Sequence, residues 1–301
     1  MAQVTLPSGI TLEYERRGAG DPLLLVMGLA GQLIDWPVEF VDELVESGFE
    51  VVMFDNRDVG LSSKTDWPPP SRRRSIMSML MRRPIKGVGY TMDHMADDAA
   101  GLIDALGFDS MDVVGMSMGG MISQALAIRH PHKVRSLCSV MSNTGDRKNG
   151  SISLKLVRLV GIPKPPNRST AVDEGVKLWR HISGDHFDET DARIRMAAAI
   201  ERSWTPDGVM RQTAAIAGSA DRTLDLNGVT APTLVVHGLK DLLVLPSGGT
   251  ATAAAVPGSR LLMFPDMGHN LPAARTPEIV AAIRSNAARA DVARHNASTP
   301  A

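Results

Sequence analysis

The sequence predicts an α/β protein with a doubly wound, mostly parallel sheet and an inserted helical lid. Short, continuously apolar runs alternate with helix-like segments, as expected when helices cover both faces of a parallel sheet. The alternation stops at residue 143, where helical patterns follow one another without strands, and it returns at about residue 220. We therefore expect a core of residues 1–142 and 220–292, a helical cap or lid at 143–219, and a flexible tail at 293–301.

The first part of the core contains six expected strands. Two short apolar stretches flank Pro7 and Gly9 and indicate a hairpin, and the continuous apolar run after Pro22 is typical of a buried strand. The helical patterns stop at Gly48, at Gly107 and just before Pro131. The expected strands lie at 4–6, 10–15, 23–27, 50–54, 111–114 and 134–141, and the expected helices at 36–46, 97–106 and 118–129.

The lid and the second part of the core follow. The lid contains a proline-rich stretch at 162–166. After the lid, strands and helices alternate again, which indicates right-handed crossovers in the same parallel sheet. The expected lid helices lie at 172–182, 191–202 and 207–217, the last strands at 233–236 and 260–264, and the last helices at 249–255 and 277–288.

The composition excludes several classes of protein. The chain has 301 residues, of which 32 are basic and 33 acidic, so its formal net charge of -1 gives no indication of a nucleic-acid partner. The N-terminus lacks the basic and apolar regions of a signal peptide, and no apolar run reaches the length of a membrane span, so we expect a cytoplasmic location. Cys138 is the one cysteine, which excludes a disulfide within the chain, and we expect it in the core. Nothing in the sequence implies a cofactor or sets the oligomeric state.

The most informative motif is Gly115-Met116-Ser117-Met118-Gly119-Gly120. It follows an expected strand and precedes an expected helix, which is the context of a G-x-S-x-G nucleophile elbow. A serine held in a strained turn needs neighbours without Cβ atoms, so that strand and helix can approach closely. We therefore interpret Ser117 as a nucleophile and Gly115 and Gly119 as residues that support the turn.

A serine nucleophile needs a base within hydrogen-bond reach, and the base needs an orienting acid. In doubly wound hydrolases the order along the chain is Ser, Asp, His, with each residue after its own strand. Asp241 follows the expected strand at 233–236, and His269 follows the one at 260–264. The separation of 28 residues (269 − 241) fits a single crossover helix. The sequence therefore predicts a triad of Ser117, His269 and Asp241.

Each triad residue also has a purely structural interpretation, because Ser and Asp form turns and caps and a loop histidine often packs on the surface. Asp146, just after the strand at 134–141, is a second candidate for the acid. Asp266 lies too close to His269 along the chain to be an obvious orienting group. We expect His237 to line the floor of the site or to pack there.

One group of lid residues resembles a metal cluster. It contains His181, Asp185, His186 and Asp188. The two histidines are five residues apart, which is not the i,i+4 spacing of ligands on one helix, and no third ligand is evident. We therefore expect solvated lid residues and no metal site.

Acyl transfer through a serine also requires two backbone N–H groups that face the developing oxyanion. One is expected from Met118, the residue after the nucleophile, where a helix N-terminus adds a favourable dipole. The other is expected from Leu29, in the loop after the strand at 23–27, with Gly28 allowing the tight turn. The alternative is that this loop only connects a strand to a helix.

The segment 71–86 contains six basic residues and no acidic one, around an apolar centre that includes Ile76, Met79 and Leu80. One interpretation is a flap that contacts anionic membrane lipid or guides a long-chain substrate. The other is a surface loop with a short helix packed on the lid and its arginines in solvent. A peripheral membrane contact is thus an open hypothesis for this chain.

Five motifs carry a resemblance to known proteins: Val26-Met27-Gly28-Leu29, Phe54-Asp55-Asn56-Arg57-Asp58-Val59-Gly60-Leu61-Ser62, Gly115 to Gly120, His237-Gly238-Leu239-Lys240-Asp241 and Gly268-His269. Together they resemble those of α/β-hydrolase esterases and lipases, in particular mycobacterial Lip-type esterases and anthracycline-methylesterase-like hydrolases. The resemblance covers residues 1 to about 290, with a weaker match in the lid, and implies the α/β-hydrolase fold, the roles given above and no cofactor. The chain departs from many relatives at Met27, where a histidine is common. Met27, Met116 and Met118 suggest apolar walls near the nucleophile.

The leading hypothesis is therefore a serine-dependent carboxylic ester hydrolase that acts through an acyl-enzyme on small to lipid-like acyl esters, with thioesters and phospholipids included. A second hypothesis keeps the triad for C–C bond hydrolysis or cofactor-free perhydrolysis. A third is a non-catalytic relative that binds a ligand or a partner, although a pure binder has no need of an intact triad.

Overall fold

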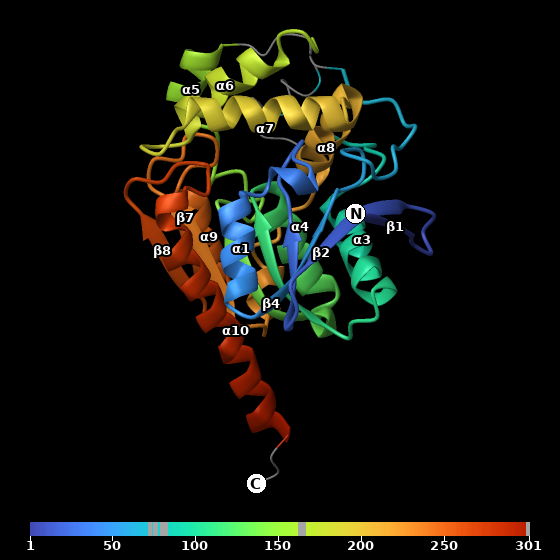
Figure 1. Ribbon diagram of the computed structural model, residues 1–301, viewed down its shortest axis with the longest axis vertical. Helices are drawn as coiled ribbons and strands as arrows, with labels where there is room; N and C mark the ends of the chain where they lie inside the picture. Colours follow the sequence, from blue (N-terminus) through green and yellow to red (C-terminus); the bar gives the residue numbers. More distant parts are fainter. Residues whose placement is uncertain (72–73, 75–77, 79–83, 162–166, 299–301) are drawn as a thin grey trace.

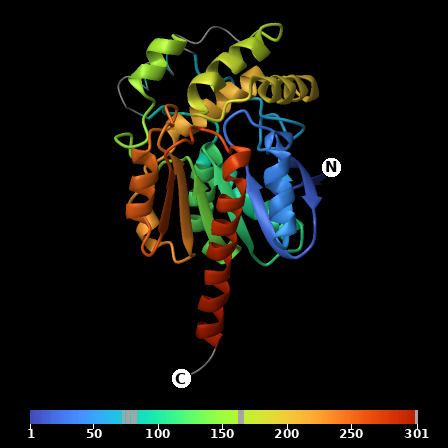
Figure 2. The ribbon, with the colours of Figure 1, turned by 60° about the vertical axis from the view of Figure 1, so that its left-hand side comes forward.

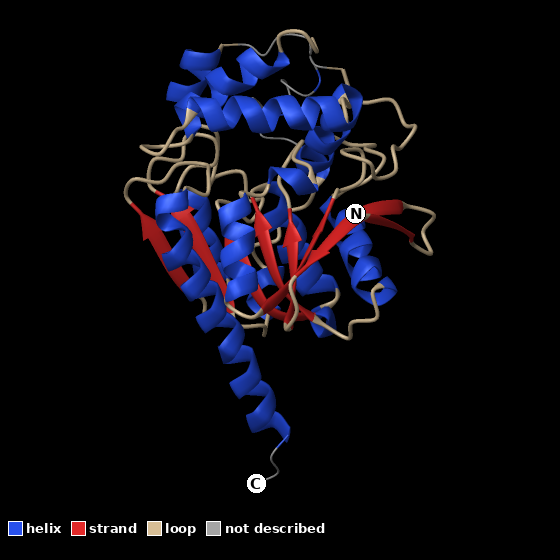
Figure 3. Cartoon of the chain, in the orientation of Figure 1, coloured by secondary structure: helices blue, strands red, loops and turns tan. Residues whose placement is uncertain are grey.

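The computed structural model describes all residues except 72–73, 75–77, 79–83, 162–166 and 299–301. The described chain forms one eight-stranded sheet with helices on both faces and a further layer of helices above it (Figure 3). The strand order is β1-β2-β4-β3-β5-β6-β7-β8, antiparallel from β1 to β4 and parallel from β4 to β8, which confirms the predicted sheet. The strands are β1 Ala2–Thr5, β2 Thr11–Arg17, β3 Asp21–Val26, β4 Phe49–Phe54, β5 Met111–Met116, β6 Val134–Val140, β7 Thr233–Gly238 and β8 Arg260–Phe264.

The two faces of the sheet bury alternate residues of the same strand, as the two-residue period of a strand requires. In β3, Leu24 and Val26 pack in a core shared with α3 and α4, whereas Leu23 and Leu25 pack in a second core with α1 and α10. Figure 2 shows α1 and α10 side by side on this second face. The flanking helices are α1 Val38–Glu46, α3 Met92–Ala105, α4 Met118–Arg129, α9 Ser247–Ala255 and α10 Thr276–Ser298.

The lid follows β6 in the sequence and lies above the carboxyl ends of the parallel strands (Figure 1). Its described helices are α5 Leu154–Val160, α6 Ala171–Ile182, α7 Glu189–Arg202 and α8 Pro206–Gly218. The sequence pattern predicted α6, α7 and α8 but not α5, because seven residues are too few to show helical spacing. The exact division of the chain at residues 143 and 219 stays a prediction.

The last helix is longer than expected. We expected it at 277–288, whereas α10 runs from Thr276 to Ser298 and its last turns project beyond the sheet (Figure 1). The extra turns are rich in alanine, which favours helix, and the first helix breaker is Pro300. Residues 293–298, which we expected in a flexible tail, are therefore part of the helix. None of the helices in the described part of the chain is both long and apolar enough to cross a membrane.

A buried ion pair fixes the loop after β4 to α3. Arg57 donates from Nε and from Nη2 to the carboxylate of Asp98, each at 2.6 Å, and both side chains are at most 10% exposed. Burial raises the pKa of Asp98 above its ordinary value, although the two hydrogen bonds from Arg57 oppose the shift. The net stability from such a pair is small, but removing one partner leaves the other charged and buried.

We therefore predict that Asp98→Ala lowers the free energy of unfolding by about 3–5 kcal/mol, because the Arg57 guanidinium then lies buried without its carboxylate. The matched control is Asp97→Ala on the same helix. Asp97 is 43% exposed and pairs with Arg129 and His130, so its loss should cost about 0–1 kcal/mol. Denaturant unfolding measures both values. Equal losses for the two variants would contradict the role given to the buried pair.

Candidate active site

Ser117 lies in a sharp turn between β5 and α4, with φ = 56° and ψ = -118°. This backbone conformation is unfavourable for a residue with a Cβ atom and persists only where the surroundings hold it. The neighbouring glycines make room for the turn. A Cβ on Gly119 would lie 1.9 Å from the carbonyl oxygen of Val26, and a Cβ on Gly115 would lie 2.2 Å from that of Gly119. The strand–turn–helix context expected for the motif is present.

The structure brings the three predicted triad residues together. His269 Nε2 lies 2.9 Å from Ser117 Oγ, and His269 Nδ1 lies 2.6 Å from Asp241 Oδ2. Ser117 follows β5, Asp241 follows β7, and His269 follows β8, so the carboxyl ends of three parallel strands supply the group. These contacts assign the proton on the neutral imidazole to Nδ1 and leave Nε2 to accept from the serine hydroxyl.

Hydrogen bonds fix the orientation of the Asp241 carboxylate. Its Oδ1 accepts from the backbone N–H groups of Leu243 and Val244, both at 2.9 Å, which leaves Oδ2 for His269. Burial alone would raise the pKa of Asp241, but the contacts with His269 and His237 outweigh it and lower the pKa to about 2. The carboxylate is therefore ionised throughout the pH range in which a neutral imidazole can act as a base.

The expected oxyanion loop lies against the nucleophile. A Cβ on Gly28 would be 3.2 Å from the Cβ and 3.8 Å from the Oγ of Ser117. Leu29 follows directly, at the carboxyl end of β3. Met118 is the first residue of α4, so its N–H has no acceptor within the helix. The backbone segments that carry the two expected donors thus flank Ser117.

The other candidate residues occupy different places. Asp146 accepts hydrogen bonds from Lys148 N and Asn149 N, and so closes its own turn. Asp266 accepts from Arg275 and contacts His186, which hold its pKa far below the ordinary value. Neither carboxylate is the partner of the His269 imidazole.

His237 packs against Asp241, which is one of the two positions expected for it. It is fully buried, and its Nε2 lies 2.9 Å from the carbonyl oxygen of Val244 and 3.4 Å from Asp241 Oδ2.

Two of the four lid residues that resembled a metal cluster form ion pairs with residues of the core. Asp185 binds Lys240, and His186 binds Asp266. Among the described residues, no group of three or more His, Cys, Asp or Glu side chains could hold a metal ion.

The lid also contacts the loop that carries His269. The backbone N–H of His269 donates to Ile182 O at 2.5 Å, and Gly184 forms an antiparallel bridge with Met267. A Cβ on Gly268 would lie 2.0 Å from Ile182 O, so this approach needs a glycine before the histidine. Sequence reasoning did not find these contacts, because no motif marks a backbone hydrogen bond between the lid and the loop of His269.

The methionines near the nucleophile are mostly core residues. Met118 is buried in the core with α3 and α4, and Met27 in the core with α1 and α10. Met116 is half-buried. Of Met27, Met116 and Met118, only Met116 is therefore still a candidate for an apolar wall near the nucleophile.

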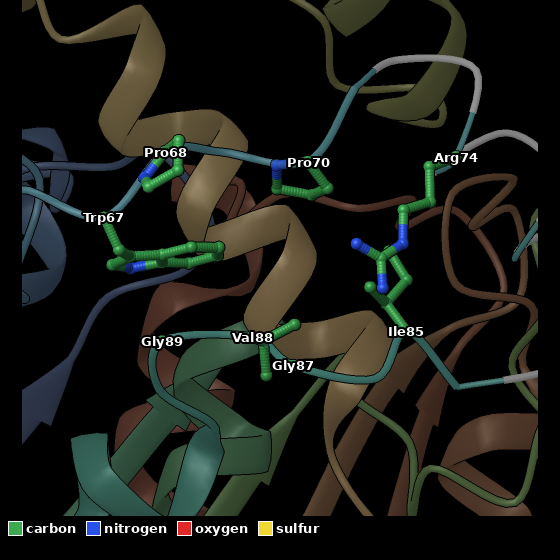
Figure 4. Close-up of a pocket in the computed structure, with 8 residues that line it drawn as sticks. All are labelled: Trp67, Pro68, Pro70, Arg74, Ile85, Gly87, Val88 and Gly89. Carbon is green, nitrogen blue, oxygen red and sulfur yellow. The ribbon is translucent and has the colours of Figure 1, made fainter.

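A separate cavity of about 270 Å³ lies between residues 67–70 and 85–89 (Figure 4). Trp67 forms one wall, and the Arg74 side chain reaches across to donate to Lys86 O at 2.6 Å. None of the lining residues belongs to the triad or to the loop after β3, so this cavity is not part of the candidate active site. The lining residues are Trp67, Pro68, Pro70, Arg74, Ile85, Gly87, Val88 and Gly89.

Comparison with known proteins agrees with the observed fold. A family profile described as alpha/beta hydrolase fold matches residues 21–273. Rhodomycin D methylesterase DnrP of Streptomyces peucetius is 29% identical over 221 residues, which cover 66% of this chain and 68% of that protein. The 2-hydroxy-6-oxo-2,4-heptadienoate hydrolase of Pseudomonas putida is 31% identical over 143 residues, or 46% of this chain and 43% of that one.

Among solved structures, a thermophilic esterase from Thermogutta terrifontis superposes with a TM-score of 0.72. It is 25% identical and the match covers 96% of this chain and 98% of that chain. The expected resemblance to α/β-hydrolase esterases is thereby confirmed.

The orientation of Asp241 generates a specific prediction. In Asp241→Asn, the amide oxygen should stay with the Leu243 and Val244 N–H groups, so the NH₂ group faces His269 Nδ1. The imidazole must then carry its proton on Nε2 and cannot accept from Ser117. We expect kcat for a p-nitrophenyl ester to fall about 10³–10⁴-fold, with an unchanged melting temperature.

The matched control is Asp266→Asn, which changes a carboxylate three residues before His269 in the sequence. It should change kcat less than about tenfold, because Asp266 contacts His186 and Arg275 and not the imidazole of His269. Comparable losses in the two variants would contradict the assignment of Asp241 as the acid.

Proposed function

Because the chain is a hydrolase of the α/β-hydrolase family, we propose that it is a serine-dependent carboxylic ester hydrolase that forms an acyl-enzyme. The observation that carries this proposal is the pair of contacts at His269, 2.9 Å to Ser117 Oγ and 2.6 Å to Asp241 Oδ2. The methylesterase and esterase relatives support the choice of esters.

In the proposed reaction, Ser117 Oγ attacks the acyl carbonyl carbon while His269 Nε2 takes the serine proton. The negative charge moves to the carbonyl oxygen, where the N–H groups of Leu29 and Met118 stabilise it. The C–O bond to the alcohol then breaks, and His269 returns the proton to the leaving oxygen. Water repeats the sequence on the acyl-enzyme, which releases the acid and restores Ser117.

The electrostatic role of Asp241 follows from its pKa. Since the carboxylate is ionised above about pH 2, it stabilises the imidazolium that forms when His269 accepts the proton. No metal or organic cofactor is needed for any step of this sequence.

The first test is Ser117→Ala. We expect turnover of a p-nitrophenyl ester to fall about 10⁴-fold or more, because no other hydroxyl replaces Oγ as the nucleophile. A fluorophosphonate probe should label the wild-type chain once, at Ser117, and should not label the variant. Ser285→Ala, an exposed serine on α10, is the control and should match the wild type. Wild-type turnover in Ser117→Ala would refute the proposed function.

A second candidate is C–C bond hydrolysis with the same triad, favoured by the similarity to the Pseudomonas putida hydrolase. Initial rates on p-nitrophenyl esters and on vinylogous diketones distinguish the two. An ester hydrolase should show the larger kcat/KM for the esters, and a C–C hydrolase the reverse.

For the segment 71–86 we propose contact with anionic membrane. Most of this segment lies outside the described residues, so the proposal rests on its charge pattern.

The lid contains a second basic segment, since residues 147–172 contain six basic residues and no acidic one. Within it, α5 exposes Leu154, Leu159 and Lys155 to solvent. Apolar side chains among basic ones suit the interface of an anionic bilayer.

Co-sedimentation with vesicles tests this contact. The wild type should bind vesicles that contain phosphatidylserine more strongly than neutral ones, and Lys155→Glu with Arg158→Glu should weaken that binding. Arg260→Glu, an exposed charge reversal on β8, should not. Equal binding of the wild type to neutral and anionic vesicles would overturn the proposal.

A further inference from the structure

The loop after β3 contains a turn that needs support from outside. Gly31 N donates to Gly28 O at 3.2 Å, which closes a four-residue turn, and Ala30 has φ = 65°. A positive φ at this position of a turn normally calls for glycine, because a Cβ atom makes the left-handed conformation unfavourable. Ala30 therefore keeps this conformation only if neighbouring groups hold it.

A glutamine of the lid provides that support. Gln212, on α8, is fully buried, and its Oε1 accepts from Ala30 N at 3.0 Å. Its Nε2 donates to the carbonyl oxygen of Arg57 at 2.8 Å. A carboxamide offers an acceptor and a donor at one end, so this single side chain joins the loop after β3 to the loop after β4.

The second of these loops is itself held firmly. Arg57 forms the buried bidentate pair with Asp98, and Asn56 Nδ2 donates to Met27 O at 2.9 Å. The lid approaches closely here, since a Cβ on Gly208 would lie 1.9 Å from Asp58 O. Gln212 therefore connects the turn at Ala30 to a fixed part of the core.

We propose that Gln212 is a positioning residue for the oxyanion hole, an inference that rests on the proposed ester hydrolysis. Its carboxamide occupies the Ala30 N–H and fixes the turn, which leaves the adjacent Leu29 N–H directed at the substrate oxygen. The lid helix α8 is then part of the catalytic apparatus in addition to covering it. Sequence reasoning missed this residue, because no motif marks a single glutamine on a lid helix as the partner of a backbone N–H group 182 residues away (212 − 30).

Gln212→Met tests the inference, since it keeps a similar volume and removes both hydrogen bonds. We expect kcat for a p-nitrophenyl ester to fall about 10–100-fold, with KM changed less than about threefold, because the oxyanion is stabilised only beyond the ground state. The affinity for a trifluoromethyl ketone, which forms an oxyanion adduct at the serine, should fall by the same factor as kcat/KM.

Two further variants make the result specific. Thr213→Val removes a hydrogen bond within the same helix, from Thr213 Oγ1 to Val209 O, and should retain wild-type kcat and inhibitor affinity. Gln212→Glu keeps an acceptor for Ala30 N–H and should retain more activity than Gln212→Met. A merely structural role would lower the melting temperature and leave kcat per folded molecule unchanged.

The inference is overturned if folded Gln212→Met keeps wild-type kcat and inhibitor affinity, or if Gln212→Glu and Gln212→Met lose equal activity. Failure of the proposed function looks different, because Ser117→Ala would then keep wild-type turnover. The wild type, Ser117→Ala and the Gln212 variants are therefore measured side by side on the same ester.

Discussion

The arrangement of the site depends on the close approach of α4 to the end of β3. Gly119, two residues after the nucleophile, has room for no side chain, because its Cβ would lie 1.9 Å from Val26 O. This approach places Ser117 in a strained turn at the carboxyl end of β5. It also directs the first N–H groups of α4 toward the space beside Ser117. A larger residue at position 119 would move the helix away from the strand and disrupt both effects together.

The parallel sheet then brings the other chemical groups to that edge. The loops after β3, β5, β7 and β8 meet there, so residues far apart in the sequence become neighbours.

Buried ion pairs join the lid to the core. Arg202 of α7 pairs with Asp55 at 2.8 Å, and Arg211 of α8 pairs with Asp58 at 3.3 Å. Since both carboxylates are fully buried, these lid arginines hold the lid against the core instead of forming a loose surface contact.

Local chemistry made the core of the site predictable. The glycines around Ser117 and the polar residues after apolar runs are signals within a few neighbouring positions. The strand order of a doubly wound sheet then brings the residues after these strands together. The helix α5 and the full length of α10 were missed because one is too short to show periodicity and the other continues through alanine-rich sequence without a strong apolar pattern.

The sequence by itself therefore determined the fold class, the elbow at Ser117 and the order Ser117, Asp241, His269. Only the tertiary structure decided how these groups are held: Leu243 and Val244 orient the acid, Ile182 contacts the histidine loop, and Gln212 supports the turn at Ala30. The physical reason is that a strained turn needs particular residue types at adjacent positions, which a sequence records. A hydrogen bond between distant segments needs only one donor and one acceptor, and many residue pairs can supply them.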